Sequence, residues 1–275
     1  MSRSAIEPRF IDGPRGKLFV ILRKPPGRAS GPCVLLVPPF AEEMNKSRRM
    51  FTLLAEGLAR RGVASLLPDL HGTGDSAGEF RDADWDLWKA ELVQSSGWAA
   101  AAGWRLTGLL GLRLGCALAA ESSAELPARP ERSVFWQPVS EGERFVTQFL
   151  RVRVAASMMA DQKESVSDLR KQLQSGATLE VAGYELSGRL IAQLDRVRLA
   201  DSIGERLGEL HWMEVVRDPS GSLPPATERF LQSVRERATS LFAHTVSGEP
   251  FWSSTEIVVL PELITRTVEL LTPPA

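Results

Sequence analysis

The chain has 275 residues, of which 43% are apolar and 24% are charged, and its net charge is -1. This length suffices for one large domain or two small ones, and the composition is that of a folded globular protein rather than a disordered chain. A net charge so close to zero gives no electrostatic basis for binding nucleic acid or acidic membranes, so we expect neither as a partner.

The start of the chain and its hydropathy bear on its location. The first residues read Met-Ser-Arg-Ser-Ala-Ile-Glu-Pro and contain no apolar segment of signal-peptide length. No stretch approaches the roughly 20 apolar residues that span a bilayer. We therefore expect a cytoplasmic protein with no transmembrane segment.

The predicted elements alternate along the chain between apolar runs and amphipathic stretches, which is typical of a parallel sheet covered by helices. The predicted strands are 17–23, 33–38, 64–67, 105–110, 133–136, 210–216 and 240–246. The predicted helices are 46–61, 84–102, 114–121, 227–237 and 261–271. This order predicts an α/β fold with a mostly parallel, twisted sheet and helices on both faces.

The alternation breaks between residues 140 and 201, where the chain is charged and helix-prone apart from a short strand-like run at 178–184. We expect residues 140–201 to form a helical lid inserted into a core made of residues 1–139 and 202–275. Such a lid would cover the carboxyl ends of the strands, the edge where open α/β sheets bind ligands.

The most informative motif is Gly111-Leu112-Arg113-Leu114-Gly115, which joins a predicted buried strand to an apolar helix. It has the frame of the Gly-x-Ser-x-Gly nucleophile elbow of α/β-hydrolases, with Arg113 at the position of the serine. Arginine stays protonated and offers no nucleophile. The motif predicts the α/β-hydrolase fold and argues against serine catalysis at the elbow.

A second sequence, Gly74-Asp75-Ser76-Ala77-Gly78, matches Gly-x-Ser-x-Gly letter for letter. A nucleophile elbow needs a strand directly before it and a helix directly after it, and this stretch has neither. It resembles instead a turn-building loop of α/β-hydrolases, so Ser76 is a weak candidate nucleophile. His71 is a candidate base for Ser76, or a loop histidine bonded to its neighbours.

The two cysteines are Cys33, in an apolar run, and Cys116, three residues beyond the elbow apex. Neither has zinc-ligand spacing, and together they make no disulfide framework. We expect two buried reduced thiols, no metal site and no other cofactor. Cys116 is a weak candidate nucleophile, because it falls inside the predicted helix and a reactive thiol needs an exposed, electropositive setting.

The other triad positions follow in the order nucleophile, acid, histidine. Asp218 comes after the strand 210–216 and suits the acid, but the loop after the last strand, Ser247-Gly248-Glu249-Pro250-Phe251-Trp252, has no histidine. His244 lies inside that strand, where we expect it to pack against the sheet.

The loop after strand 33–38, which forms the oxyanion hole in α/β-hydrolases, carries Phe40, Glu42 and Glu43. Carboxylates would repel a developing oxyanion, but they suit an arginine. We therefore expect Glu42 or Glu43 to pair with Arg113, because an unpaired buried charge destabilises the fold.

Four stretches together resemble one family: residues 38–50, the loop 68–76, the elbow and the Gly248-Glu-Pro-Phe-Trp loop. The family is the second α/β-hydrolase-fold protein of the exosortase A system of Gram-negative bacteria, and residues 181–187 also resemble it. The resemblance implies an accessory protein near exopolysaccharide biosynthesis and the sorting of proteins with a C-terminal Pro-Glu-Pro signal. Fold does not establish reaction, and no serine triad can be carried over.

Three functions remain open at this point. The first is a non-catalytic protein that binds a small anionic or saccharide ligand, with Arg113 at a helix N-terminus and Phe40, Phe251 and Trp252 as an apolar wall. In the alternative form of that site, Arg113 is held in a closed ion pair. The second is an active esterase or acyltransferase with a relocated nucleophile. The third is a scaffold for another protein encoded at the same locus.

Overall fold

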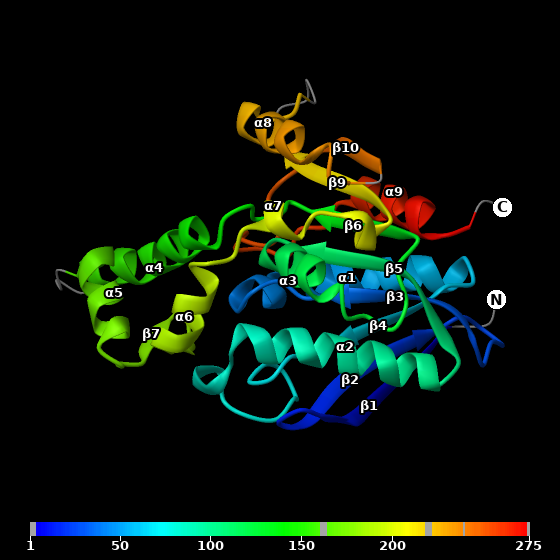
Figure 1. Ribbon diagram of the computed structural model, residues 1–275, viewed down its shortest axis with the longest axis horizontal. Helices are drawn as coiled ribbons and strands as arrows, with labels where there is room; N and C mark the ends of the chain where they lie inside the picture. The colour runs from blue at the N-terminus through cyan, green and yellow to red at the C-terminus, as the bar shows by residue number, and fades with distance from the viewer. Residues whose placement is uncertain (1–3, 160–163, 218–221, 239, 274–275) are drawn as a thin grey trace.

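In a computed structural model, which describes residues 4–159, 164–217, 222–238 and 240–273, a central sheet runs through the molecule (Figure 1). The eight strands of this sheet are β1 (Ala5–Gly13), β2 (Gly16–Lys24), β3 (Gly31–Val37), β4 (Ala64–Pro68), β5 (Trp104–Leu112), β6 (Arg132–Trp136), β9 (Glu209–Val216) and β10 (Ser240–Ser247). Their spatial order is β1-β2-β4-β3-β5-β6-β9-β10. The pairs β1/β2 and β2/β4 are antiparallel, and every later pair is parallel. The predicted fold is confirmed.

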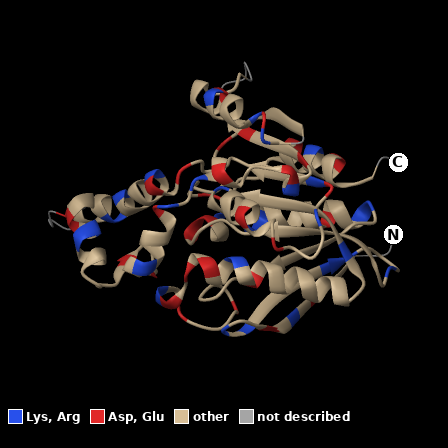
Figure 2. Ribbon diagram, viewed as in Figure 1, with Lys and Arg blue, Asp and Glu red and all other residues tan. Residues whose placement is uncertain are grey.

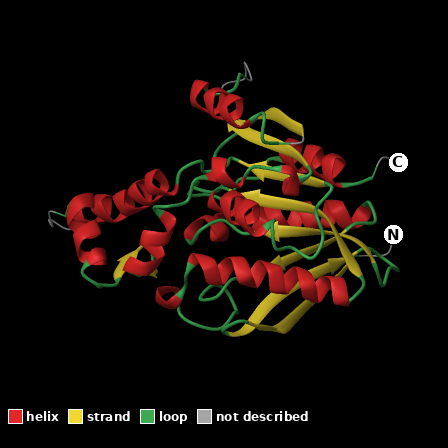
Figure 3. Ribbon diagram, viewed as in Figure 1, coloured by secondary structure: helices red, strands yellow, loops and turns green. Residues whose placement is uncertain are grey.

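Helices cover both faces of the sheet (Figure 3). The helices of the core are α1 (Glu42–Arg60), α2 (Trp85–Ala101), α3 (Leu114–Ser122), α7 (Leu199–Ser202), α8 (Pro225–Val234) and α9 (Pro261–Leu271). Two apolar clusters result. One joins α2, α3 and α8 to one face of the sheet, and the other packs α1 and α9 on the opposite face. Basic and acidic positions are interspersed along the ribbon (Figure 2).

The segment between β6 and β9 projects beyond the carboxyl ends of the parallel strands (Figure 1). Its elements are α4 (Gly142–Met159), α5 (Val166–Gln174), β7 (Leu179–Val181), β8 (Tyr184–Leu186) and α6 (Gly188–Leu194). The strands β7 and β8 form a two-stranded antiparallel hairpin, where the sequence shows its one strand-like run. Buried leucines on α5 and α6 pack the segment together, including Leu169, Leu173 and Leu190.

Three elements differ from the sequence prediction. The strand β1 was not predicted, because it is an edge strand whose side chains are mostly exposed and so lacks a buried apolar run. Helix α1 begins at Glu42 rather than at residue 46, since Glu42 and Glu43 fit the positive end of the helix dipole. Helix α8 ends at Val234, three residues before the predicted end.

Candidate functional site

The elbow begins where β5 ends, and Arg113 occupies its apex. The backbone of Arg113 has φ 56° and ψ -121°. A residue with a side chain adopts such a positive φ only where the surrounding structure holds it there. The flanking glycines allow the close approach: a Cβ at Gly111 would lie 2.6 Å from the Cα of Cys116, and one at Gly115 would overlap the Pro38 carbonyl oxygen. The local fold is that of a nucleophile elbow, built around an arginine.

The Arg113 guanidinium is held in a closed ion pair. Its Nε donates to Glu43 Oε1 at 3.0 Å, and its Nη1 lies 3.4 Å from the Gln137 carbonyl oxygen. The indole ring of Trp252 lies over the guanidinium, 5.3 Å from its central carbon, at a distance that favours a cation–π contact. The predicted ion pair is confirmed, and its carboxylate is Glu43 rather than Glu42.

The Glu43 carboxylate is almost fully buried, and burial raises its pKa even though Arg113 lowers it in turn. Its second oxygen, Oε2, has no hydrogen-bond partner among the described residues. Both partners are shielded, since the side chain of Glu43 is 12% exposed and that of Arg113 is 17% exposed. A pair so shielded from solvent keeps much of its Coulomb attraction.

The aromatic residues predicted around Arg113 lie in two places. Phe251 is fully buried and packs edge-on against Trp136 and Trp252, on the arginine side of the elbow. Phe40 lies in the other apolar cluster, where its ring contacts Trp88 and the α4 residues Phe145 and Phe149. The three aromatic residues therefore do not form one wall.

The remaining predicted positions are Asp218, the candidate acid, and His244 in the last strand. Asp218 lies outside the described residues. His244 lies on β10, and its Nε2 is 3.2 Å from His211 Nδ1, with the two rings stacked. This pairing agrees with the expectation that His244 packs against the sheet.

Ser76 is held by backbone groups. Its hydroxyl donates to the Asp69 carbonyl oxygen at 2.6 Å and accepts from the Phe19 amide at 2.8 Å. These bonds tie the loop after β4 to strand β2, which is the turn-building role that the sequence context indicates.

His71 is buried beside Glu91, with 4.0 Å between Nδ1 and Oε1. Its ring lies against Gly78, and no hydrogen bond joins it to Ser76 within the described residues. Burial lowers the pKa of His71. Its backbone is fixed as well, because its amide donates to Glu91 Oε2 at 2.8 Å and its carbonyl accepts from Trp88 Nε1 at 3.1 Å.

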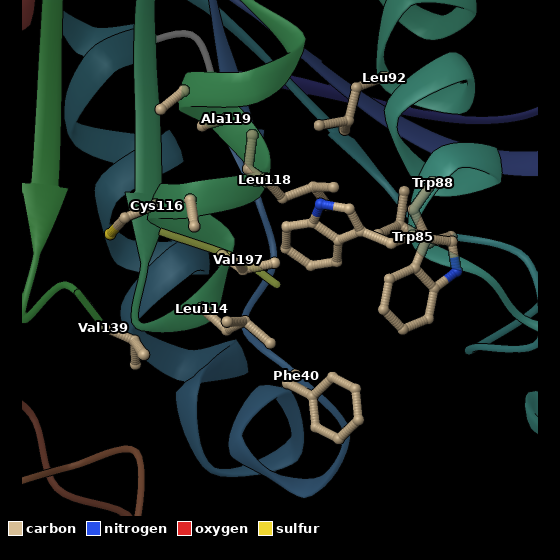
Figure 4. Close-up of a cluster of buried hydrophobic side chains, with 14 of the residues drawn as sticks. Phe40, Trp85, Trp88, Leu92, Leu114, Cys116, Leu118, Ala119, Val139 and Val197 are labelled. Carbon is tan, nitrogen blue, oxygen red and sulfur yellow. The ribbon is translucent and has the colours of Figure 1, made fainter. Parts of the chain in front are cut away.

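Cys116 is fully buried, and burial raises the pKa of its thiol well above the ordinary value. Its Sγ lies 3.6 Å from the Trp136 carbonyl oxygen, and the side chain points away from Trp85 and Trp88 (Figure 4). A buried thiol of raised pKa is a poor nucleophile. The other cysteine, Cys33, is also buried with a raised pKa.

The other side of the elbow opens into a cavity of about 160 Å³. Leu114 and Gly115, the first residues of α3, line it, whereas Arg113 does not. Figure 4 shows Leu114 and Leu118 of α3 facing Phe40 and the two tryptophans of α2. The cavity residues that sequence reasoning missed are Asn45, Arg48, Asp69, Trp85, Trp88 and Tyr184. Asn45, Arg48, Asp69 and Tyr184 fall inside the motifs singled out in the sequence, but nothing there marks them as facing a cavity.

Within the described ranges, no group of three or more His, Cys, Asp or Glu side chains is arranged to hold a metal ion. Over the same part of the chain, none of the helices combines the length and the apolar character that a bilayer crossing requires.

Solved structures with a similar backbone fold identify the fold of this chain. Est1E from Butyrivibrio proteoclasticus with bound ferulic acid matches with a TM-score of 0.70, at 17% identity over 95% of this chain and 96% of that one. A thermostable carboxyl esterase from Bacillus coagulans in complex with glycerol matches with a TM-score of 0.63, at 12% identity over 98% and 99%. The chain has the α/β-hydrolase fold. A lidless α/β serine hydrolase from Xanthomonas campestris matches with a TM-score of 0.56, at 16% identity over 100% and 98%. A scan against protein-family models and a search of curated proteins both return no match.

Proposed function

We propose that the chain is a non-catalytic α/β-hydrolase-fold protein that binds a small ligand in the cavity beside its elbow. In this proposal residues 1–139 and 202–275 form the core, and residues 140–201 form a lid over the binding site. The motifs that resemble the second hydrolase of the exosortase A system support a role in exopolysaccharide production or protein sorting.

The observation that carries the proposal is the Arg113–Glu43 pair at the apex of the elbow. Acyl transfer by this fold needs a nucleophile at the apex and a histidine from the loop after the last strand. Here the apex is a paired arginine, and Trp252 from that loop covers it. Both catalytic positions are filled by groups that bind each other.

The closed pair also bears on where a ligand binds. An anion at Arg113 would have to displace Glu43, which already accepts a hydrogen bond from the guanidinium at 3.0 Å. The cavity beside Leu114 needs no such exchange. Apolar walls with a few polar groups are the usual lining of small-molecule sites.

The alternative of a relocated nucleophile has little support from the described residues. The Ser76 hydroxyl donates to one backbone group and accepts from another, and the thiol of Cys116 is buried with a raised pKa. A hydroxyl engaged in this way would have to break a loop contact before it could attack an ester.

Hydrolysis of p-nitrophenyl acetate and butyrate tests the proposal. We expect the rate with the purified protein to equal the rate in buffer, and the Arg113→Ser variant to stay at background because the loop after β10 holds no histidine. A wild-type rate at least 100-fold above background, lost in Ser76→Ala, would overturn the proposal in favour of an active hydrolase.

A further inference from the structure

The cavity beside the elbow has an apolar interior and a polar rim. Its interior is formed by buried side chains, among them Phe40, Leu70, Trp85, Trp88 and Leu118. The aromatic rings among them pack edge-on, with 6.0 Å between the centroids of Phe40 and Trp88. The indole N–H of Trp85 already donates to Glu121, and that of Trp88 to His71. The interior therefore presents carbon surface, which suits an alkyl or aryl group.

The rim is formed by Asn45 and Arg48 of α1, Asp69 after β4, and Tyr184 of the lid hairpin. Arg48 Nη1 lies 3.9 Å from Asp69 Oδ1, which is too long for a hydrogen bond. Among the described residues the Arg48 guanidinium makes no closer polar contact. The two groups thus face each other across a gap in which one can donate and the other can accept.

The remaining rim groups also keep hydrogen-bonding capacity. Asn45 Nδ2 donates to the Tyr184 hydroxyl at 3.1 Å, so that hydroxyl still has its own proton to donate. The Asp69 carboxylate is held in place because its Oδ2 accepts from the Asp75 amide at 3.0 Å. The rim therefore offers several donors and acceptors close together.

The charge at the rim disfavours a charged head group. The charged side chains that line the cavity are Arg48 and Asp69, one of each sign, and they lie 3.9 Å apart, so their charges balance at the rim. An anion would meet the Asp69 carboxylate, and a cation would meet the Arg48 guanidinium. A neutral group with several hydroxyls can donate to Asp69 and accept from Arg48 at once.

We propose that this cavity binds a neutral glycoside, with its alkyl or aryl group in the apolar interior and its sugar hydroxyls between Arg48 and Asp69. This inference rests on the proposed function, since it names the class of ligand for the same site. It places the ligand on the Leu114 side of the elbow, away from the Arg113–Glu43 pair.

Calorimetric titration with hexyl β-D-glucopyranoside, glucose and hexanoate tests the proposal. We expect the glucoside to bind at least 10-fold more tightly than either of the other two. Arg48→Met should weaken glucoside binding at least 5-fold, whereas Arg49→Met, an exposed neighbour on the same helix that does not line the cavity, should leave it unchanged.

Three results would overturn the inference: no glucoside binding at millimolar concentration, hexanoate binding as tightly as the glucoside, or unchanged glucoside affinity in Arg48→Met. Asp69 also orders its loop, so the Asp69→Asn variant is first required to unfold at the same temperature as the wild type. Its affinity for the glucoside should then be at least 5-fold lower. Turnover of p-nitrophenyl esters would overturn the proposed function and leave this binding result standing, so the two failures are distinguishable.

Discussion

Arg113 and Leu114 are neighbours in the chain, but they serve opposite sides of the elbow. On the Arg113 side Glu43 pairs with the guanidinium and Trp252 lies over it. On the Leu114 side a cavity remains, with an apolar interior and a polar rim. One helix start therefore borders both a closed site and an open one.

The difference separates ligand binding from acyl transfer, two properties that usually occur together on this fold. The cavity is lined by the loops after β3 and β4, by helices α1, α2 and α3, and by the β7–β8 hairpin. Acyl transfer on this fold depends instead on the apex residue and the loop after the last strand. Glu43 and Trp252 both contact Arg113, and none of the three lines the cavity. An elbow without catalysis, as we propose, is thus compatible with ligand binding in the cavity.

The largest expected effect is on the closed side. Glu43→Ala leaves a mostly buried guanidinium without its carboxylate, and we expect a loss of about 3 kcal/mol in the free energy of unfolding. Urea denaturation followed by tryptophan fluorescence measures it. Glu42→Ala is the matched control, because Glu42 makes no contact with Arg113, and it should change the free energy by less than about 0.5 kcal/mol. Equal stabilities of Glu43→Ala and Glu42→Ala would contradict a structural role for the pair.

The second prediction concerns Glu91 of α2, the helix that carries Trp85 and Trp88 of the cavity, and the change of stability with pH. Glu91 is fully buried, its Oε1 has no hydrogen-bond partner within the described residues, and burial raises its pKa to about 7. A carboxyl whose pKa is higher in the folded state stabilises the fold below its unfolded pKa of about 4.5, and this stabilisation is lost as the pH rises through about 7.

Glu91→Gln removes that titration and keeps an acceptor for the His71 amide. Between pH 5 and pH 8 we expect the wild type to lose about 2 kcal/mol of stability relative to this variant, measured by urea denaturation at each pH. His71, whose pKa is lowered, titrates in both proteins with the opposite sign, so the comparison cancels much of its contribution. Parallel pH profiles would show that Glu91 titrates normally.

The smallest effect concerns the hydrogen bond between Asn45 of α1 and Tyr184 of β8. Tyr184→Phe removes the hydroxyl that accepts from Asn45 and keeps the ring that packs on Phe80. We expect a loss of about 0.5–1 kcal/mol in the free energy of unfolding. Asn45→Ala should cost a similar amount, and the double variant should be little less stable than either single one. Fully additive losses would mean that the two side chains do not interact.

The sequence predicts the fold well, because the elements that define it are buried on both faces. The runs that became β3, β5 and β9 are rich in valine and leucine, and the two glycines of the elbow mark a close backbone approach. The edge strand β1 escaped prediction because most of its side chains face solvent. The predicted start of α1 is four residues late, because the loop that the hydrolase pattern predicts after strand 33–38 covers the first turn of the helix.

The site was predicted only in part, for a similar reason. The Arg113–Glu43 pair could be predicted because a buried charge needs a partner and few carboxylates were in reach. The cavity could not, since it depends on how Asn45, Asp69 and Tyr184 meet in space from three separate segments. The same limit applies to Phe40, which the sequence placed with Trp252 and the fold places against the lid.

The most direct test of a closed, non-catalytic elbow is covalent labelling with a fluorophosphonate, read by intact-protein mass and peptide mapping. We predict an unmodified mass under conditions in which a serine esterase is labelled completely. A stoichiometric adduct on Ser76 would contradict this, since it would show that the hydroxyl leaves its two backbone partners and reacts.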